Sequence, residues 1–431
     1  MKALLLLSVL AQSPGAARRI DVVAAERLAL EHSPALHMAS SRAESMDDQS
    51  RSLRGRMLPG VFVSDEHQRY SEPFTITFNL GVPGVPSPSL IGRELNTNTF
   101  VAAAQQPLLG LLHLWQDKAG LDDAALAAHQ VERITTEAIS EAVQTGYLKY
   151  FEGKAAEDVA KASIAQLEEQ RQVTEARVKA GAATNADVLR LDVAVANAKQ
   201  QLIVARAQQE MTYSALLLAM GYTAQDADIE LLEPTALEAG EVPPLNEVDA
   251  QRSAAAGRPE VERARLEQSA AEHQATARFL SLLPEANLEA AYMHMTGQAF
   301  APPDSMYVGV KASWNVWEWG ASWYQRQAAV RNAEAVAAAR EEQVRVVMTD
   351  ASTKLAVVRS AHAAVGVAET AITSAEEAWR VTQALLKAGA ATTTDLLDAQ
   401  AALTQAKLNL VRARSQQAVA LVGLKRAVGI R

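Results

Sequence analysis

Lys179-Ala180-Gly181-Ala182-Ala183-Thr184 recurs 208 residues later as Lys387-Ala388-Gly389-Ala390-Ala391-Thr392. The two copies continue without a gap to Gly221 and Gly429, and 19 of the 43 aligned positions are identical. An internal repeat of this length indicates two copies of one structural unit inside a single fold. The chain is therefore predicted to contain the same turn twice.

The repeated segment has the features of a tight turn between two helices. Gly181 and Gly389 follow alanine-rich runs, and glycine readily adopts the left-handed conformation that ends a helix. In both copies a threonine at the expected start of the next helix is followed three residues later by an acid: Thr184 and Asp187, Thr392 and Asp395. This spacing suits a capping box near the positive end of a helix. Each copy therefore predicts an antiparallel helical hairpin.

Composition favours long helices with small side chains. Hydrophobic residues make up 49% of the 431 residues, whereas aromatic residues make up 5%, and alanine supplies much of the difference. Such side chains suit closely packed long helices. The net charge of −9 and the lack of a basic stripe argue against a nucleic-acid partner. The absence of cysteine excludes disulfides and thiolate metal sites.

The first residues resemble a secretory signal peptide. A basic start is followed by an apolar run from Ala3 to Ala11 and by small residues near Ala17. A frayed N-terminal helix is the alternative, and the expected signal peptide is residues 1–17. No later stretch approaches the roughly 18 uninterrupted apolar residues of a membrane-spanning helix. If this chain spans a membrane, strands must do so.

Both halves of the chain show the same predicted order of helix, two strands, long helix, turn and helix. In the first repeat, residues 18–220, this order is a helical pattern over 22–57, a strand pair at about 59–107, a long helix, a turn at 179–184 and a helix. A connector rich in proline and glycine, with small irregular elements, is expected at 221–257. In the second repeat, residues 258–431, a helix precedes a strand pair at about 285–317, a long helix, a turn at 387–392 and a final helix. Ser33-Pro34 matches Arg258-Pro259 at an offset of 225.

The second strand pair has the alternation of a membrane strand. Val308, Val310, Ala312 and Trp314 are expected on one face, and Tyr307, Gly309, Lys311 and Ser313 on the other. A strand half-buried in a soluble sheet would show the same alternation. Four of the six tryptophans follow closely and favour a membrane interface, although an aromatic core cluster is the alternative: Trp314, Trp317, Trp319 and Trp323.

The sequence has no pattern that indicates an enzyme. It lacks a phosphate-binding glycine loop, a dinucleotide fingerprint, a zinc-protease motif and a nucleophile elbow. The eight histidines do not pair at metal-ligand spacing. The sequence therefore predicts no catalytic residue, no metal site and no cofactor.

From about residue 21 to the C-terminus, the chain resembles the TolC-like outer-membrane efflux factors. The resemblance is sharpest in the hairpins, where Arg177, Gly181 and Asp187-Val188-Leu189 match the first motif. Lys387-Ala388-Gly389 and Asp395-Leu396-Leu397-Asp398-Ala399 match the second. Near the second tip, Leu386 and Ala391 replace polar or charged residues that tie the closed tip in some members.

The resemblance implies a mainly helical fold combined with a membrane β-barrel. Three copies would each give four strands to a 12-stranded barrel in the outer membrane, in contact with its lipid, and their helices would form an α-barrel in the periplasm. The connector would lie in an equatorial girdle. The hairpin tips would dock onto a periplasmic adaptor (membrane fusion) protein and thereby onto an inner-membrane transporter. The chain would then be a passive exit duct for efflux or type I secretion.

The resemblance also assigns roles to individual residues at the tips. Asp395 and Asp398 match the acidic pair that lines the channel constriction, and Asp187 is the corresponding acid of the first hairpin. The dipole at the start of a helix would explain the same acids without a channel, and for Asp187 the cap is the preferred interpretation. Adaptor contacts are expected at the two turns: Lys179, Gly181, Thr184, Lys387, Gly389 and Thr392.

A second hypothesis is a soluble periplasmic coiled-coil scaffold or interaction protein. It accounts for the hairpins but leaves the strand alternation and the tryptophan cluster unexplained. A periplasmic adaptor would contain only one such hairpin, flanked by β segments that this sequence lacks. The sequence does not name the exported substrate.

Overall fold

The computed structural model describes residues 18–78, 81, 86, 88–222, 229–233 and 244–430. The predicted signal peptide, residues 1–17, lies outside these described residues. The chain forms two compact units: unit 1 comprises residues 1–39, 131–261 and 343–431, and unit 2 comprises residues 40–130 and 262–342. The two long helices, α3 (Leu111–Lys179) and α7 (Ala321–Lys387), contribute to both units.

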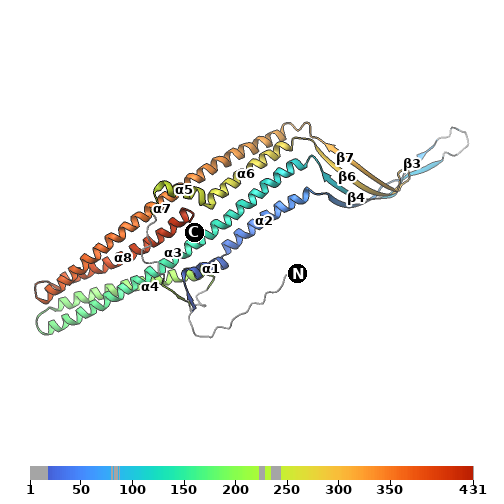
Figure 1. Cartoon of the computed structure of the whole chain (residues 1–431). Helices are drawn as coiled ribbons and strands as arrows, with labels where there is room; N and C mark the ends of the chain where they lie inside the picture. Colours follow the sequence, from blue (N-terminus) through green and yellow to red (C-terminus); the bar gives the residue numbers. More distant parts are fainter. Residues whose placement is uncertain are drawn as a thin grey trace. The chain divides into compact units, whose positions relative to one another are not determined.

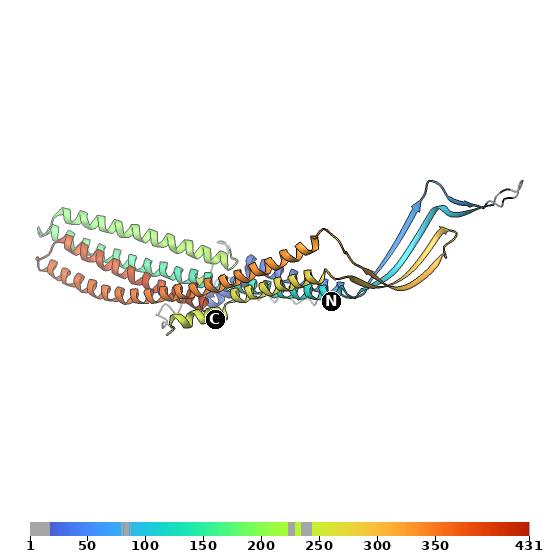
Figure 2. The same ribbon diagram turned by 90° about the horizontal axis from the view of Figure 1, so that it is seen from above.

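Unit 1 contains the two predicted hairpins. In the first, α3 packs against α4 (Asn185–Ala219), and in the second, α7 packs against α8 (Thr393–Ala427). Ion pairs link the helices within each hairpin, such as Arg206 to Glu157 at 2.8 Å and Arg414 to Glu369 at 3.0 Å. Neutral hydrogen bonds join α3 to α8 across the two hairpins, including Ser163 to Thr404 at 3.2 Å and Gln400 to Gln166 at 2.8 Å. Figure 2 shows α4 and α7 at opposite edges of this four-helix arrangement.

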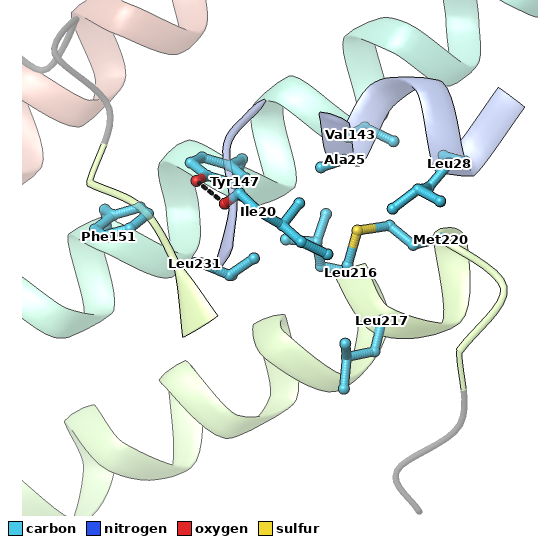
Figure 3. Close-up of a cluster of buried hydrophobic side chains, with 11 residues drawn as sticks. Ile20, Ala25, Leu28, Val143, Tyr147, Phe151, Leu216, Leu217, Met220 and Leu231 are labelled. Atoms are coloured by element: carbon cyan, nitrogen blue, oxygen red, sulfur yellow. Dashed lines mark hydrogen bonds between the residues drawn. The ribbon is translucent and has the colours of Figure 1, made fainter. Parts of the chain in front are cut away.

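The N-terminal segment is held on the first hairpin by a hydrophobic cluster and by the hydrogen bonds of one tyrosine. The cluster includes Ile20, Leu28, Tyr147, Leu216 and Leu231. Strand β1 (Arg18–Ile20) pairs in parallel with β5 (Ile229–Leu231), and α1 (Val22–His32) follows β1. The buried Tyr147 hydroxyl donates to the Ile20 carbonyl at 2.9 Å and also contacts the Leu232 carbonyl (Figure 3). Because both carbonyls belong to the paired segments, one side chain of α3 fixes both strands.

The internal repeat is more complete than the sequence prediction. The predicted helix over 22–57 is two helices, α1 and α2 (Pro34–Arg56), separated at Ser33. The expected connector at 221–257 contains a regular helix, α5 (Glu247–Gly257), followed by α6 (Pro259–Leu280). Helices α1 and α5 are related by the same offset of 225, and each ends next to a proline because proline disfavours helical backbone in the residue before it.

Unit 2 carries the sheet. Helices α2, α3, α6 and α7 lie side by side and lead into the strands (Figure 1). The strand order is β2 (Gly60–Arg69), β4 (Ser89–Pro107), β6 (Glu285–Gln298) and β7 (Asp304–Ser313), all antiparallel, and β3 (Phe74–Thr77) pairs with the start of β4. Strands β6 and β7 lie within the range of the second predicted pair, whereas the range of the first also contains the short strand β3. Trp314 lies just beyond the end of β7.

Among the described residues, one helix, α7, is long and apolar enough to cross a membrane by length and composition alone. Its most apolar 18-residue window has a mean hydropathy of 1.3, and 22% of that window is buried. No such stretch was predicted from the sequence, because the criterion there was an uninterrupted apolar run. Alanine and valine raise the mean hydropathy here despite interspersed charges. One face of α7, including Val347, Ala351, Leu355 and Val358, packs in a cluster with α5 and α8 in unit 1.

Candidate functional site

Each hairpin ends in the predicted glycine turn. Gly181 has φ of +73°, its N–H donates to the Val178 carbonyl at 2.9 Å, and the next N–H donates to the Arg177 carbonyl at 2.8 Å. Gly389 has φ of +77°, with equivalent bonds to Leu386 at 3.2 Å and Leu385 at 2.9 Å. This is the Schellman pattern that closes a helix C-terminus. The positive φ values require glycine at both positions.

The acid after each turn caps the following helix. The Asp187 carboxylate accepts the Thr184 backbone N–H at 3.0 Å and its hydroxyl at 2.7 Å. The Asp395 carboxylate accepts the same groups of Thr392 at 2.8 and 2.7 Å. These hydrogen bonds lower the pKa of both carboxyls, chiefly through the Thr184 hydroxyl for Asp187 and the Thr392 backbone N–H for Asp395. Both acids are therefore charged at neutral pH and oriented by their own helix ends.

The other predicted tip residues are exposed. Asp398 lies three residues beyond Asp395 in α8, so the two acids share a helical face. Unlike Asp395, it has no capping role in the described part of the chain. Lys179 and Lys387 end α3 and α7, and within the described residues neither forms an ion pair. Asp398, Lys179 and Lys387 are thus the charged tip residues that neither cap a helix nor form an ion pair within the described residues.

Contacts between the two hairpins close to their tips could not be derived from the sequence. The Arg177 guanidinium donates to the Leu386 carbonyl at 3.5 Å, and the Leu386 side chain is buried. Thr393 of α8 contributes, after Thr184, to the lowered pKa of Asp187 in α4. The two hairpins are therefore in register near their tips.

Each outer helix carries an apolar stripe that no described residue covers. On α4 the exposed residues are Leu189, Val193, Val204, Met211 and Leu218. At 100° per residue they lie opposite the buried face formed by Leu191, Val195 and Leu216. On α7 the corresponding exposed residues are Val346, Val357, Val367, Val381 and Leu385. Unit 1 thus presents two different unpartnered apolar edges.

The two faces of the sheet differ in polarity. One rung joins Val61, Ala104, Ala290 and Val308, and the next rung on this face joins Val63, Ala102, Tyr292 and Met306. Met306 is 82% exposed and Val308 75% exposed, so this apolar face has no partner in the described chain. The opposite face includes Glu289, Tyr307 and Lys311, with the Tyr307 hydroxyl donating to Glu289 at 2.8 Å. The predicted alternation of β7 is therefore present.

Exposed aromatic residues, here called the aromatic rim, gather where the strands meet the helices. The rim comprises Trp314, Trp317, Trp319, Trp323, Tyr324, Phe279 and Trp115, all exposed. Trp115 was missed by the sequence analysis, although it is related to Trp323 by the same offset of 208 that relates the turns. Trp319 is the one non-glycine residue of the described chain with positive φ, 53°, and its ring lies 5.7 Å from that of Trp317. The rim marks the end of the apolar face.

No group of three or more His, Asp or Glu side chains in the described residues is arranged to hold a metal ion. Histidine side chains instead contact single side chains of other helices, such as His129 with Asp47 at 3.2 Å and His273 with Gln116 at 2.7 Å. The chemistry available is therefore that of charged tips, apolar edges and an aromatic rim.

Solved structures share this fold across almost the whole chain. CusC superposes with a TM-score of 0.82 at 15% identity, covering 98% of this chain and 96% of that chain. VceC from Vibrio cholerae, an outer membrane protein, gives 0.79 at 16% identity and covers 95% of this chain and 96% of its own. The open-state outer membrane channel MtrE from Neisseria gonorrhoeae gives 0.77 at 17% identity, covering 95% and 89%. At these identities the likeness shows the fold.

The sequence itself establishes the family. No curated protein matches this sequence. The pattern of the outer membrane efflux protein family matches residues 26–222 and 251–430, which include both hairpins and the whole sheet. The two matched stretches coincide with the two halves of the internal repeat. The chain belongs to the outer membrane efflux protein family.

Proposed function

We propose that three copies of this chain form a passive exit duct in the outer membrane, as part of a tripartite efflux or type I secretion system. The observation that supports this proposal is that each of the two units has two different edges without a partner among the described residues. In unit 1 these are the apolar stripes of α4 and α7. In unit 2 they are the outer strands of the sheet, β2 and β7. Two different edges of one chain can associate head to tail, and such contacts form a ring when the rotation from copy to copy closes.

The apolar face of the sheet supports a position in lipid. Ten residues separate Asp304 from Trp314, which is about 34 Å along a strand at about 3.4 Å per residue. A strand tilted by about 45° then spans about 25 Å of membrane. Open strand edges do not occur in lipid, so a four-stranded sheet needs further strands to close it. Three copies would supply the 12 strands of a barrel.

The hairpin tips support contacts with the other components. We assign Lys179, Gly181, Thr184, Lys387, Gly389 and Thr392 to docking on a periplasmic adaptor protein, which would link the duct to an inner-membrane transporter. Asp398 and Asp395 would line the constriction, where three copies bring like charges together and favour cations. Asp187 is better explained as a cap, because its carboxylate accepts the Thr184 backbone N–H and hydroxyl. The duct would need no cofactor and would catalyse no reaction.

Single-channel recording in planar bilayers tests this function. Purified protein should give stable conductance steps with cation selectivity, and Asp398→Asn should reduce that selectivity because it removes three charges from the constriction. Arg331→Gln, which removes an exposed charge paired with Glu334 on α7, is the matched control. Absence of conductance, together with a protein that stays out of the membrane, would favour the soluble scaffold.

A further inference from the structure

Arg326, in the second turn of α7, is an arginine of the aromatic rim without an acidic partner. Its guanidinium carbon lies 5.2 Å from the ring centre of Trp323 and 5.2 Å from that of Phe279, on α6. Its Nε is enclosed and has no hydrogen-bond partner. Among the described residues no carboxylate lies within ion-pair distance of it. By contrast, Arg331 pairs with Glu334 at 2.7 Å.

The aromatic residues that contact Arg326 are exposed, Trp323 to 51% and Phe279 to 49%. Trp319, seven residues before Arg326, is 86% exposed although its backbone has the left-handed conformation that side chains other than glycine rarely adopt. The two nearest acids along the chain, each eight residues away, are engaged: Glu318 accepts hydrogen bonds from Asn315 and Ser322, and Glu334 pairs with Arg331. The Arg326 guanidinium, in contact with two aromatic rings, therefore has no counterion among the described residues.

We infer that this part of the rim binds the headgroup of an anionic phospholipid, with the Arg326 guanidinium as the phosphate-binding group. The planar guanidinium matches two oxygens of a phosphodiester and is weakly hydrated. The rings of Trp323 and Phe279 would contact the glycerol region, and the exposed apolar face of β7 would contact the acyl chains. A zwitterionic lipid fits less well, because its ammonium finds no free carboxylate beside Arg326. The inference rests on the proposed function, since it requires the rim to lie at a lipid surface.

Titration of the detergent-extracted protein with phosphatidylglycerol, followed by native mass spectrometry, tests the inference. The wild-type protein should bind phosphatidylglycerol more tightly than phosphatidylethanolamine. Arg326→Gln should weaken phosphatidylglycerol binding at least about tenfold, because a charge-assisted bidentate contact is lost. Arg326→Lys should lie between them, since it keeps the charge but loses the planar fork. Arg331→Gln, on the same helix, should bind like the wild type.

Three results would overturn the inference: unchanged phosphatidylglycerol affinity of Arg326→Gln, equal affinity of the wild type for both lipids, or displacement of the lipid by millimolar inorganic phosphate, which would indicate a free-anion site. The oligomeric mass of each variant is read in the same spectra and reports its folding. Trimeric protein with unchanged lipid binding would refute this inference alone. A wild-type protein that is soluble without detergent would refute the proposed function together with it.

Discussion

The outer stripe of α4 gives the sharpest test of head-to-tail assembly. Val204 lies at the centre of the stripe and is 59% exposed in the single chain. Burying a whole valine side chain contributes about 1.5–3 kcal/mol, so covering the exposed part contributes about 1–2 kcal/mol in each copy. A trimer has three such contacts, which together contribute about 3–6 kcal/mol. At 1.4 kcal/mol per tenfold change, losing them lowers the association constant by about 10² to 10⁴.

Val204→Asp removes this contribution and adds a carboxylate that would be buried without a partner. Valine and aspartate have similar helix propensities, so the fold of the monomer should be retained. We expect the variant to appear as monomer when its mass is measured across a dilution series in detergent. The control is Gln201→Asp, because Gln201 is exposed one turn before Val204, about 60° around the helix from it and outside the row of apolar residues. A fully trimeric Val204→Asp protein at nanomolar concentration would refute the assignment of this edge.

Three further predictions concern the turns and the buried tyrosine. Gly389→Ala should destabilise the second tip by about 1–2 kcal/mol because φ is +77°, and amide hydrogen exchange of residues 385–396 should rise about tenfold; unchanged exchange would contradict the Schellman turn. Asp395→Asn should raise exchange at the start of α8, whereas Asp398→Asn should not, and equal effects would show that Asp395 has no capping role. Burial, followed by the charge of Asp21, raises the pKa of Tyr147 to about 12. The unfolded chain loses this proton near pH 10, whereas the folded chain keeps it until about pH 12. The free energy of unfolding should therefore be constant below pH 10 and should fall by about 2–3 kcal/mol as the pH rises toward 12. Urea unfolding of Tyr147→Phe should lack this pH dependence, and the same dependence in the variant would refute the assignment.

The parts of the fold that the sequence predicted are those set by local rules. Glycine with positive φ, the capping pair three residues apart and strict alternation along β7 each act over a few residues, and all three are present in the structure. The internal repeat then allowed the order of elements found in one half of the chain to be predicted for the other half. Even the helix break at Ser33 had a sequence signal, because the X-Pro pair recurs at Arg258-Pro259.

The contacts that the sequence did not predict join residues far apart in the chain. Strands β1 and β5 have three residues each and pair across about 210 positions, so no periodicity marks them. The hydrogen bond from Arg177 to the Leu386 carbonyl depends on how two hairpins pack. Arg326 lies between rings of α6 and α7, and only the packed helices bring Phe279 to it. Trp115 is different, because the offset of 208 from Trp323 was available in the sequence.

We propose that this chain closes its edges by forming a ring of three in the outer membrane. The cross-linked mass of the protein, extracted in detergent from purified outer membrane, tests this proposal directly. We expect a single species of about three times the mass of one chain, which is 46.2 kDa for all 431 residues. A monomer or dimer recovered from the soluble fraction would refute the ring and would leave the two helical hairpins without a channel.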